Sequence, residues 1–298
     1  METGRTESRF LHPRIALVFS LILLTACQFF GTSSPAAQEA VATPPLSTPP
    51  VVVTPVPSPQ PTLSLAEKEA LVLEYYTTNC KLPCLWGIVP GETEWQSVQS
   101  FFSTIATELS TSAESETDTY YSAEVYLPVP QEISSRGELV QYFIVNDGKV
   151  EIIDFVSPGG TNKVYTIFEI LNTYGLPTEV KIDTYAYSFG EINLFHLALF
   201  YPDKNILVRY GTSANFIDEY VVGCFQSGNG SVVVWSSELD LSFAEALNGT
   251  RGLGTFGEQY YKALEEATEM DIETFYQTYL DPDTETCIET PAELWMDR

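Results

Sequence analysis

Histidine and basic residues are scarce in this chain of 298 residues. It has two histidines, His12 and His196, and 14 Lys and Arg against 40 Asp and Glu, so its formal net charge is −26. A surface this acidic is repelled by phosphate backbones, which excludes binding to nucleic acid by charge neutralisation. With only His196 beyond the N-terminal segment, a metal site built from two or three histidines is also excluded.

An apolar run long enough to span a bilayer comfortably is also lacking. The N-terminal run Ile15–Leu24 follows a basic start and ends in Leu24-Thr25-Ala26-Cys27. A basic start, a short apolar core and small residues before the cleavage point are typical of a secretory signal peptide. The last four residues resemble the lipobox of bacterial lipoproteins. That resemblance implies removal of residues 1–26, attachment of lipid, palmitate included, to Cys27, and acylation of its new amino group.

The expected location is therefore the extracytoplasmic face of a bacterial membrane, either the cell membrane or the outer membrane, with the lipid as the membrane contact. An ordinary signal peptide or a signal anchor with a chance cysteine is the alternative. If the chain is a lipoprotein, residues 27–63 form the lipidated cysteine and a linker. The linker is predicted because eight prolines lie from Pro44 to Pro61, among Thr, Ser and Val. Such a segment samples polyproline II and could extend roughly 100 Å.

The other four cysteines are Cys80, Cys84, Cys224 and Cys287. An even number in an exported chain favours two disulfides, and four cysteines allow three connectivities. The short spacing around Pro83 favours Cys80–Cys84, which leaves Cys224–Cys287. A zinc site built from all four cysteines is the alternative. Such a site needs a second pair of cysteines close in sequence, and Cys224 and Cys287 are far apart. The Cys80–Cys84 spacing is one residue too long for a thioredoxin-like redox motif.

The most distinctive segment beyond the linker runs from Cys80 to Thr93. Its pattern, Cys-x-x-Pro-Cys-x-x-Gly-Ile-x-Pro-Gly-x-Thr, resembles one found in exported bacterial proteins and lipoproteins of unknown function. The resemblance covers about fifteen residues and implies no chemistry. We interpret the segment as a folding clasp, with a ligand or partner site as the alternative.

Hydrophobic periodicity predicts an α+β domain over residues 64–298, in which antiparallel sheets pack against amphipathic helices. The domain can be divided into subunits 64–157 and 158–298. Capping boxes at Ser64 and Thr93 start two helices, a third begins at Thr161 and ends before Gly175, and Ser242 caps a short one. Further helices are predicted at 257–268 and 271–280. Strands are predicted at 120–127, 139–145, 150–156, 179–188, 192–201, 205–211, 217–225 and 231–236, with a polar loop at 107–119 and hairpin turns at 146–149 and 228–230.

The order helix, Tyr174-Gly175-Leu176-Pro177, then antiparallel strands resembles small outer-membrane-assembly lipoproteins of the BamE type. Pro90-Gly91-Glu92-Thr93 before a helix is similar to their opening turn. The resemblance implies two helix-on-sheet units in tandem, 88–156 and 160–225, followed by a C-terminal helical segment. This chain is much longer and more acidic than those proteins, so the resemblance bears on architecture more than on a role in envelope assembly.

No catalytic constellation, metal site or cofactor is predicted. A Ser-His-Asp or Cys-His system would have to use His196, which lies inside a predicted strand, and no Gly-x-Ser-x-Gly elbow is present. Asp281-Pro282-Asp283-Thr284-Glu285 spaces its acids as a calcium loop does, but lacks the glycine and the final glutamate of such a loop.

Two functions remain from the sequence. The first is a non-enzymatic binding or scaffold module at the cell envelope, whose partner is an envelope protein or the cell wall. The alternative is a hydrolase that cleaves cell-wall or extracellular polymer with paired carboxylates. A cleft with two facing acids, one of raised pKa, would favour the hydrolase. An exposed apolar or aromatic patch would favour the binding module.

Overall fold

The computed structural model describes residues 63–77, 80–113, 118–156, 165–184, 194–225, 230–248, 257–281 and 287–295. Residues 59–298 form one compact unit. The predicted signal peptide, Cys27 and the linker as far as residue 62 lie outside the described residues. No helix within the described ranges is both long and apolar enough to cross a membrane.

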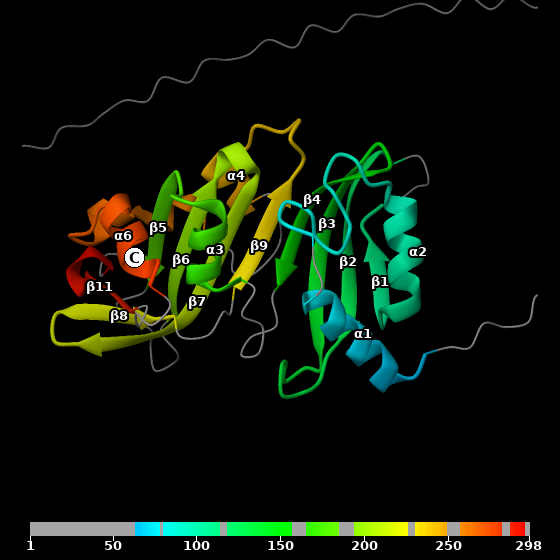
Figure 1. Ribbon diagram of the computed structural model, residues 1–298, viewed down its shortest axis with the longest axis horizontal. Coiled ribbons are helices and arrows are strands. Elements are labelled where there is room, and N and C mark those ends of the chain that lie inside the picture. Colours follow the sequence, from blue (N-terminus) through cyan, green and yellow to red (C-terminus); the bar gives the residue numbers. More distant parts are fainter. Residues whose placement is uncertain are drawn as a thin grey trace, which may run out of the picture. The chain divides into compact units, whose positions relative to one another are not determined.

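The first part of the unit carries two helices and a four-stranded meander (Figure 1). In chain order, these are α1(Leu65–Thr77), α2(Trp95–Ile105), β1(Glu108–Thr111), β2(Tyr120–Pro128), β3(Glu138–Asn146) and β4(Lys149–Val156). The second part alternates strands with short helices. Its elements are α3(Ile167–Tyr174), β5(Glu179–Thr184), β6(Leu194–Tyr201), η2(Pro202–Lys204), β7(Ile206–Ile217), β8(Tyr220–Cys224), β9(Gly230–Trp235), α4(Phe243–Asn248), η3(Glu258–Tyr260), β10(Lys262–Ala263), α5(Leu264–Ala267), α6(Ile272–Tyr279), β11(Cys287–Pro291) and η4(Ala292–Trp295).

All strand pairs are antiparallel, and one continuous sheet has the order β1-β2-β3-β4-β9-β7-β6-β5-β10. The predicted α+β class with an antiparallel sheet is therefore confirmed. The pairing of β4 with β9 joins the two parts, with Ile152 opposite Trp235 and Val156 opposite Ser231. A branch leaves this sheet where the end of β7 pairs with β8, and β8 pairs in turn with β11.

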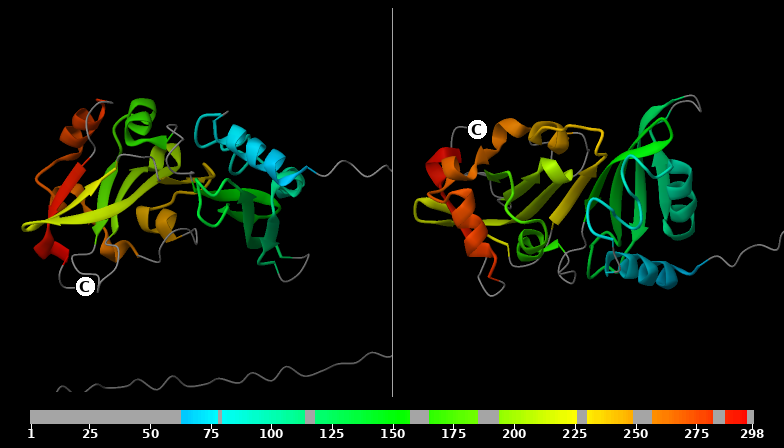
Figure 2. Two further views of the ribbon diagram at one scale, coloured as in Figure 1. Left: turned by 90° about the horizontal axis from the view of Figure 1, so that it is seen from below. Right: turned by 45° about the horizontal axis from the view of Figure 1, so that its top comes forward.

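Helices cover both faces of the central strands. The larger core lies on the face covered by α1, α2 and α3, where Tyr76, Phe102 and Leu171 are fully buried; α1 and α3 lie on the same side of the sheet (Figure 2). The smaller core lies on the opposite face, where Phe243 of α4 packs against Phe200 and Trp235. Because β9 is covered on both faces, every one of its residues is buried, which explains its unbroken apolar run Val232–Trp235.

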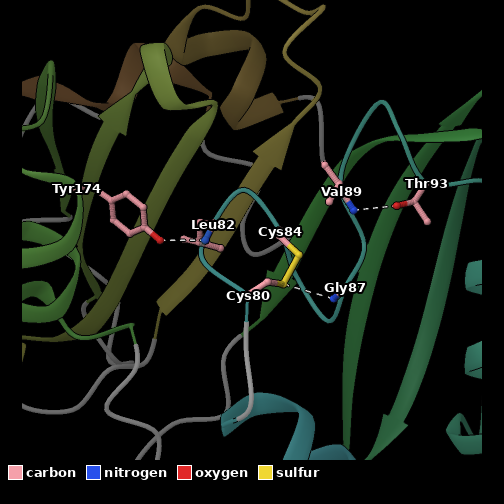
Figure 3. The surroundings of a disulfide bond; sticks show 7 residues. All are labelled: Cys80, Leu82, Cys84, Gly87, Val89, Thr93 and Tyr174. Atoms are coloured by element: carbon pink, nitrogen blue, oxygen red, sulfur yellow. Dashed lines mark hydrogen bonds between the residues drawn. A yellow bond between two sulfur atoms is a disulfide. The ribbon is translucent and has the colours of Figure 1, made fainter.

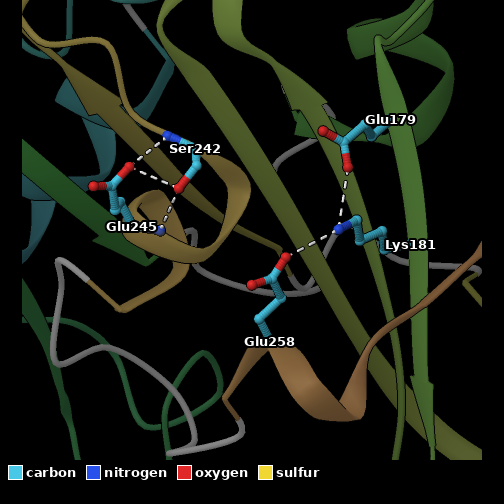
Figure 4. A network of polar contacts seen from close by, with 5 residues as sticks. All are labelled: Glu179, Lys181, Ser242, Glu245 and Glu258. Carbon is cyan, nitrogen blue, oxygen red and sulfur yellow. Dashed lines mark hydrogen bonds and ion pairs between the residues drawn. The ribbon is translucent and has the colours of Figure 1, made fainter.

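A polar contact attaches η3 to the sheet, and a capping box closes the start of α4 (Figure 4). Lys181 of β5 lies 3.1 Å from a carboxylate oxygen of Glu179 and 3.4 Å from one of Glu258 in η3. Its ammonium group also lies 4.2 Å from the centroid of the Phe243 ring, a cation–π contact. At the start of α4, the Glu245 carboxylate accepts hydrogen bonds from Ser242 N–H and Oγ.

Local signals placed several boundaries correctly. The capping boxes at Ser64 and Ser242 are present as hydrogen-bonded pairs with Glu67 and Glu245, and Asp271 caps α6 through Thr274 N–H. Asp147 and Gly148 have positive φ at the β3–β4 turn, as the predicted two-residue hairpin requires. Gly175, with φ of +80°, ends α3.

Other predictions were wrong. Thr93 does not cap α2: its hydroxyl accepts from Val89 N–H, and α2 begins after Glu94 without a side-chain cap. Residues 108–111 form the edge strand β1, which a solvated position allows to be polar. Residues 257–268 contain η3, β10 and α5, because Lys262 and Ala263 pair with the edge of β5.

The strand prediction also failed around β7. This strand runs without interruption from Ile206 to Ile217. The sequence had predicted two strands, 205–211 and 217–225, with a break at 212–216. The strands β8 and β9 do not form the predicted hairpin with each other: β8 pairs with β7 and β11, and β9 pairs with β4 and β7. These partners are distant in sequence, so the turn signal at 228–230 could not reveal them.

The Cys80–Cys84 loop packs between the two parts (Figure 3). Gly87 N–H donates to Cys80 Sγ, and the hydroxyl of Tyr174 at the end of α3 accepts from Leu82 N–H at 3.0 Å. Further along, Gly91 has φ of +83° and a Cβ there would collide with Ser236 after β9. The segment from Cys80 to Thr93 thus contacts α3 through Leu82 and Ser236 after β9 through Gly91, and it leads into α2. These contacts support its interpretation as a clasp.

A buried ion pair crosses the junction of the two parts. Arg209 Nη2 of β7 lies 2.8 Å from Asp154 Oδ2 of β4, and Arg209 Nε donates to Ser231 Oγ of the intervening β9 at 3.0 Å. The Asp154 side chain is fully buried and that of Arg209 is 7% exposed. Within the described residues, Asp154 Oδ1 has no hydrogen-bond partner, so the carboxylate depends on Arg209 for its stabilisation.

We therefore expect Arg209→Met to lower the free energy of unfolding by about 3–5 kcal/mol, because it leaves a buried carboxylate without its counter-charge. Asp154→Leu combined with Arg209→Met should restore much of that loss. The matched control is Lys204→Met at the exposed Lys204–Asp203 pair, which should cost less than about 1 kcal/mol. Urea denaturation measures the free energy of unfolding of all three variants. Equal losses for Arg209→Met and Lys204→Met would contradict the expectation.

Candidate functional site

A surface groove lies where the β7–β8–β11 branch meets α5 and α6. Its volume is about 550 Å³, within the range of ligand-binding hollows. We call it the β8–β11 groove. It is lined by Tyr220, Val222, Glu266, Ala267, Thr268, Glu269, Met270, Thr274, Cys287, Ile288, Glu289, Pro291 and Leu294.

The floor of the groove is one face of two paired strands. Tyr220 of β8 lies opposite Pro291 of β11, Val222 opposite Glu289, and Cys224 opposite Cys287. Residues two apart on a strand share a face, so Tyr220, Val222 and Glu289 face the groove while Val221 points into the core, where it is buried. Ile288 is also buried and contributes to the groove lining. The floor therefore combines apolar surface with one carboxylate.

The rim of the groove is acidic. Glu266 in α5 and Glu269 in the following turn are exposed, as is Glu289 on the floor. Among the residues that the structure describes, no Lys, Arg or His lines the groove. A ligand that enters the groove therefore meets three carboxylates.

Apolar side chains are exposed at the tip of the β7–β8 hairpin, next to the groove. Phe216, Ile217 and Tyr220 are 43%, 55% and 44% exposed. Asp218 in the turn has φ of +53°, a conformation that aspartate tolerates better than most residues. The hairpin reaches β6 because Gly223 has no side chain: a Cβ there would overlap the Phe195 ring.

Hydrogen bonds hold the walls of the groove. The Tyr279 hydroxyl of α6 donates to the Cys287 carbonyl at 2.8 Å, and Thr290 Oγ1 donates to the Ala267 carbonyl at 2.6 Å. Trp295 Nε1 donates to Thr290 Oγ1 at 3.0 Å. Burial raises the pKa of Tyr279 to about 12, so its hydroxyl remains a donor throughout the physiological range. The groove is thus a preformed feature.

The structure joins Cys80 to Cys84 and Cys224 to Cys287, the pairs that the spacing favours. The second disulfide links β8 to β11, and Cys287 lines the groove. Cys27, the predicted lipidation site, lies outside the described residues, as do residues 282–286 of the calcium-like segment. Of the two described disulfides, Cys224–Cys287 is therefore the one that contributes to the groove lining.

His196 of β6 is half-buried and its Nδ1 lies 3.2 Å from Oδ2 of the buried Asp183 on β5. A histidine oriented by a carboxylate is two thirds of a nucleophilic triad. The pair joins two adjacent strands, because Asp183 of β5 lies opposite His196 of β6 in the register.

The displaced carboxyl pKa values belong to helix starts. The pKa of Glu67 is lowered by its hydrogen bond from the Ser64 side chain, that of Glu245 by Ser242, and that of Asp271 by Thr274. All three stabilise helix N-termini. Within the described ranges, no group of three or more His, Cys, Asp or Glu is placed to hold a metal ion.

No family model matches this chain, and neither a curated protein nor a solved structure does.

Sequence reasoning did not find the groove. Tyr220, Glu266 and Glu289 come from three segments that only the β8–β11 pairing and the packing of α5 bring together. One local signal was available: Phe216-Ile217-Asp218-Glu219-Tyr220 places large apolar residues on both sides of a tight turn. Such residues in a solvated hairpin tip indicate a contact surface.

The two disulfides should differ in their effect on stability. Replacing Cys224 and Cys287 by alanine opens a link with a sequence separation of 63 and should cost about 4 kcal/mol, because the unfolded chain gains loop entropy. Replacing Cys80 and Cys84, separated by 4, should cost about 2 kcal/mol. Denaturant unfolding of the two double variants compares them. A larger loss for the Cys80–Cys84 variant would show that the clasp has a stabilising role beyond chain entropy.

Proposed function

We propose that this protein is a membrane-anchored extracytoplasmic lipoprotein that acts as a non-enzymatic docking module at the cell envelope. The β8–β11 groove, with the exposed side chains of the neighbouring hairpin tip, carries this proposal. Cys27 attaches the chain to the membrane, and the proline-rich linker lets the folded unit reach partners away from it. The partner is a protein of the envelope.

The exposed hairpin tip supports docking in particular. Phe216, Ile217 and Tyr220 keep about half of their surface in water, which is unfavourable unless a partner covers them. Tyrosine and phenylalanine are also enriched at protein interfaces, because they bury a large area with few rotatable bonds. Their place beside a hollow with mixed apolar and acidic lining suits a protein segment.

The displaced pKa values among the described carboxylates come from helix capping. A carboxylate hydrolase needs a general acid whose pKa is raised near a second acid. The carboxyl groups with displaced pKa are Glu67, Glu245 and Asp271, and each is lowered by helix capping.

The anchor is tested by Cys27→Ala. We expect the parent chain to sediment with membranes and to incorporate labelled palmitate, and the variant to do neither. The matched control is Cys80→Ala with Cys84→Ala, which changes two cysteines outside the lipobox and should leave both properties unchanged. Palmitate incorporation by the Cys27 variant would contradict lipidation at this residue.

Docking is tested with a photoreactive phenylalanine analogue in place of Tyr220 in intact cells. We expect a discrete cross-linked adduct with one envelope protein, and we expect Val222→Arg in the groove floor to abolish it. The control places the same analogue at Tyr120, a 66% exposed tyrosine at the start of β2, where no such adduct should form. An adduct of equal yield at both positions, or none at Tyr220, would contradict a docking role for the groove.

A further inference from the structure

We propose that the β8–β11 groove binds a basic segment of its partner, in which Lys or Arg side chains flank apolar ones. This inference rests on the proposed docking function and names the chemistry of what docks. It follows from the charge of the rim, the spread of the carboxylates and the apolar floor.

The charge of the groove selects a cationic partner. Glu266, Glu269 and Glu289 line it, with no Lys, Arg or His among the other described lining residues, and the whole chain has a net charge of −26. The field of such a protein attracts basic partners and increases their rate of encounter. An acidic or neutral segment would leave the three carboxylates without counter-charges in a partly covered site.

The arrangement of the carboxylates suits several cationic side chains better than one metal ion. Glu266 and Glu269 lie on α5 and the turn after it, whereas Glu289 lies on β11 across the groove. Within the described residues, no group of three or more potential ligands converges on a metal. Separate carboxylates can each pair with a different Lys or Arg, and long basic side chains can span the width of the groove.

The apolar lining of the groove requires a partner segment that has apolar side chains as well as positive charge. Tyr220, Val222 and Pro291 form the floor, and Met270 and Leu294 line the walls. Methionine adapts to side chains of different shape. Covering these residues favours a segment whose apolar side chains enter the groove while its basic ones meet the rim. A purely cationic polymer would leave that surface in contact with water.

Two other occupants fit less well. The linker of this chain, residues 28–63, has no Lys or Arg, so it cannot neutralise the rim. A second copy of the chain carries the same large negative charge, which opposes self-association. The observations therefore favour a different, basic protein.

The test uses residues 59–298, which form one compact unit, and fluorescently labelled peptides as probes. A short peptide that alternates lysine and leucine should bind, and increasing ionic strength should weaken binding. A glutamate–leucine peptide and a lysine–serine peptide should each bind at least about tenfold more weakly, since one lacks the charge and the other the apolar contacts.

Matched variants locate the site. The combination Glu266→Gln, Glu269→Gln and Glu289→Gln should weaken binding of the lysine–leucine peptide about tenfold, through loss of its ion pairs with the three groove carboxylates. Glu92→Gln, Glu108→Gln and Glu132→Gln make the same charge change at exposed residues outside the groove and should have less than about a twofold effect. Circular dichroism melts confirm that both variants fold.

Three results would overturn the proposal. The first is an equal loss of binding affinity in both triple variants, which indicates nonspecific attraction. The others are binding of the lysine–serine peptide as tight as that of the lysine–leucine peptide, or tighter binding of the glutamate–leucine peptide. Concentration-dependent dimerisation in sedimentation, abolished by Val222→Arg, would assign the groove to a second copy. These outcomes are distinct from failure of docking itself. A Tyr220 cross-link that depends on Val222, without binding of the lysine–leucine peptide, would retain the docking function and reject the basic partner.

Discussion

The antiparallel pairing of β4 with β9 is the contact on which the rest of this structure depends. Without it, the meander of β1–β4 and the strands β5–β9 would be two sheets, each with a long apolar edge open to water. The Asp154–Arg209 pair crosses this junction and passes over Ser231 of β9. A shift of the register by one residue would move these charges to the opposite, apolar face. The ion pair thus specifies one register, whatever its net contribution to stability.

The groove depends on that junction through β7. The first residues of β7 pair with β9 and β6, and its last four pair with β8. The same strand therefore holds the central sheet and carries the branch to which β11 is attached by pairing and by the Cys224–Cys287 disulfide. Hydrogen bonds from Tyr279 and Thr290 fix β11 against α5 and α6. An acidic, partly apolar hollow is the result, and its walls are rigid enough to present a preformed surface.

Elements governed by near neighbours could be predicted from the chain. The Ser64 and Ser242 capping boxes, the Asp147-Gly148 turn and Gly175 after α3 involve contacts within four residues. Predictions failed where a distant partner decided the conformation. The polar segment 108–111 is a strand because β2 lies beside it, and Lys262 and Ala263 are extended because β5 has a free edge there.

The pairing of the cysteines and the charge of the surface were readable from residue types, counts and spacing. The location of the site was not. Tyr220, Glu266 and Glu289 are spread over about seventy residues, and each looks like an ordinary surface residue in its own segment. Strand pairing and helix packing between remote segments bring these residues together. The free energy for that packing comes from burial of apolar surface across the whole domain. Periodicity shows that such a face must be buried, but does not show which other segment buries it.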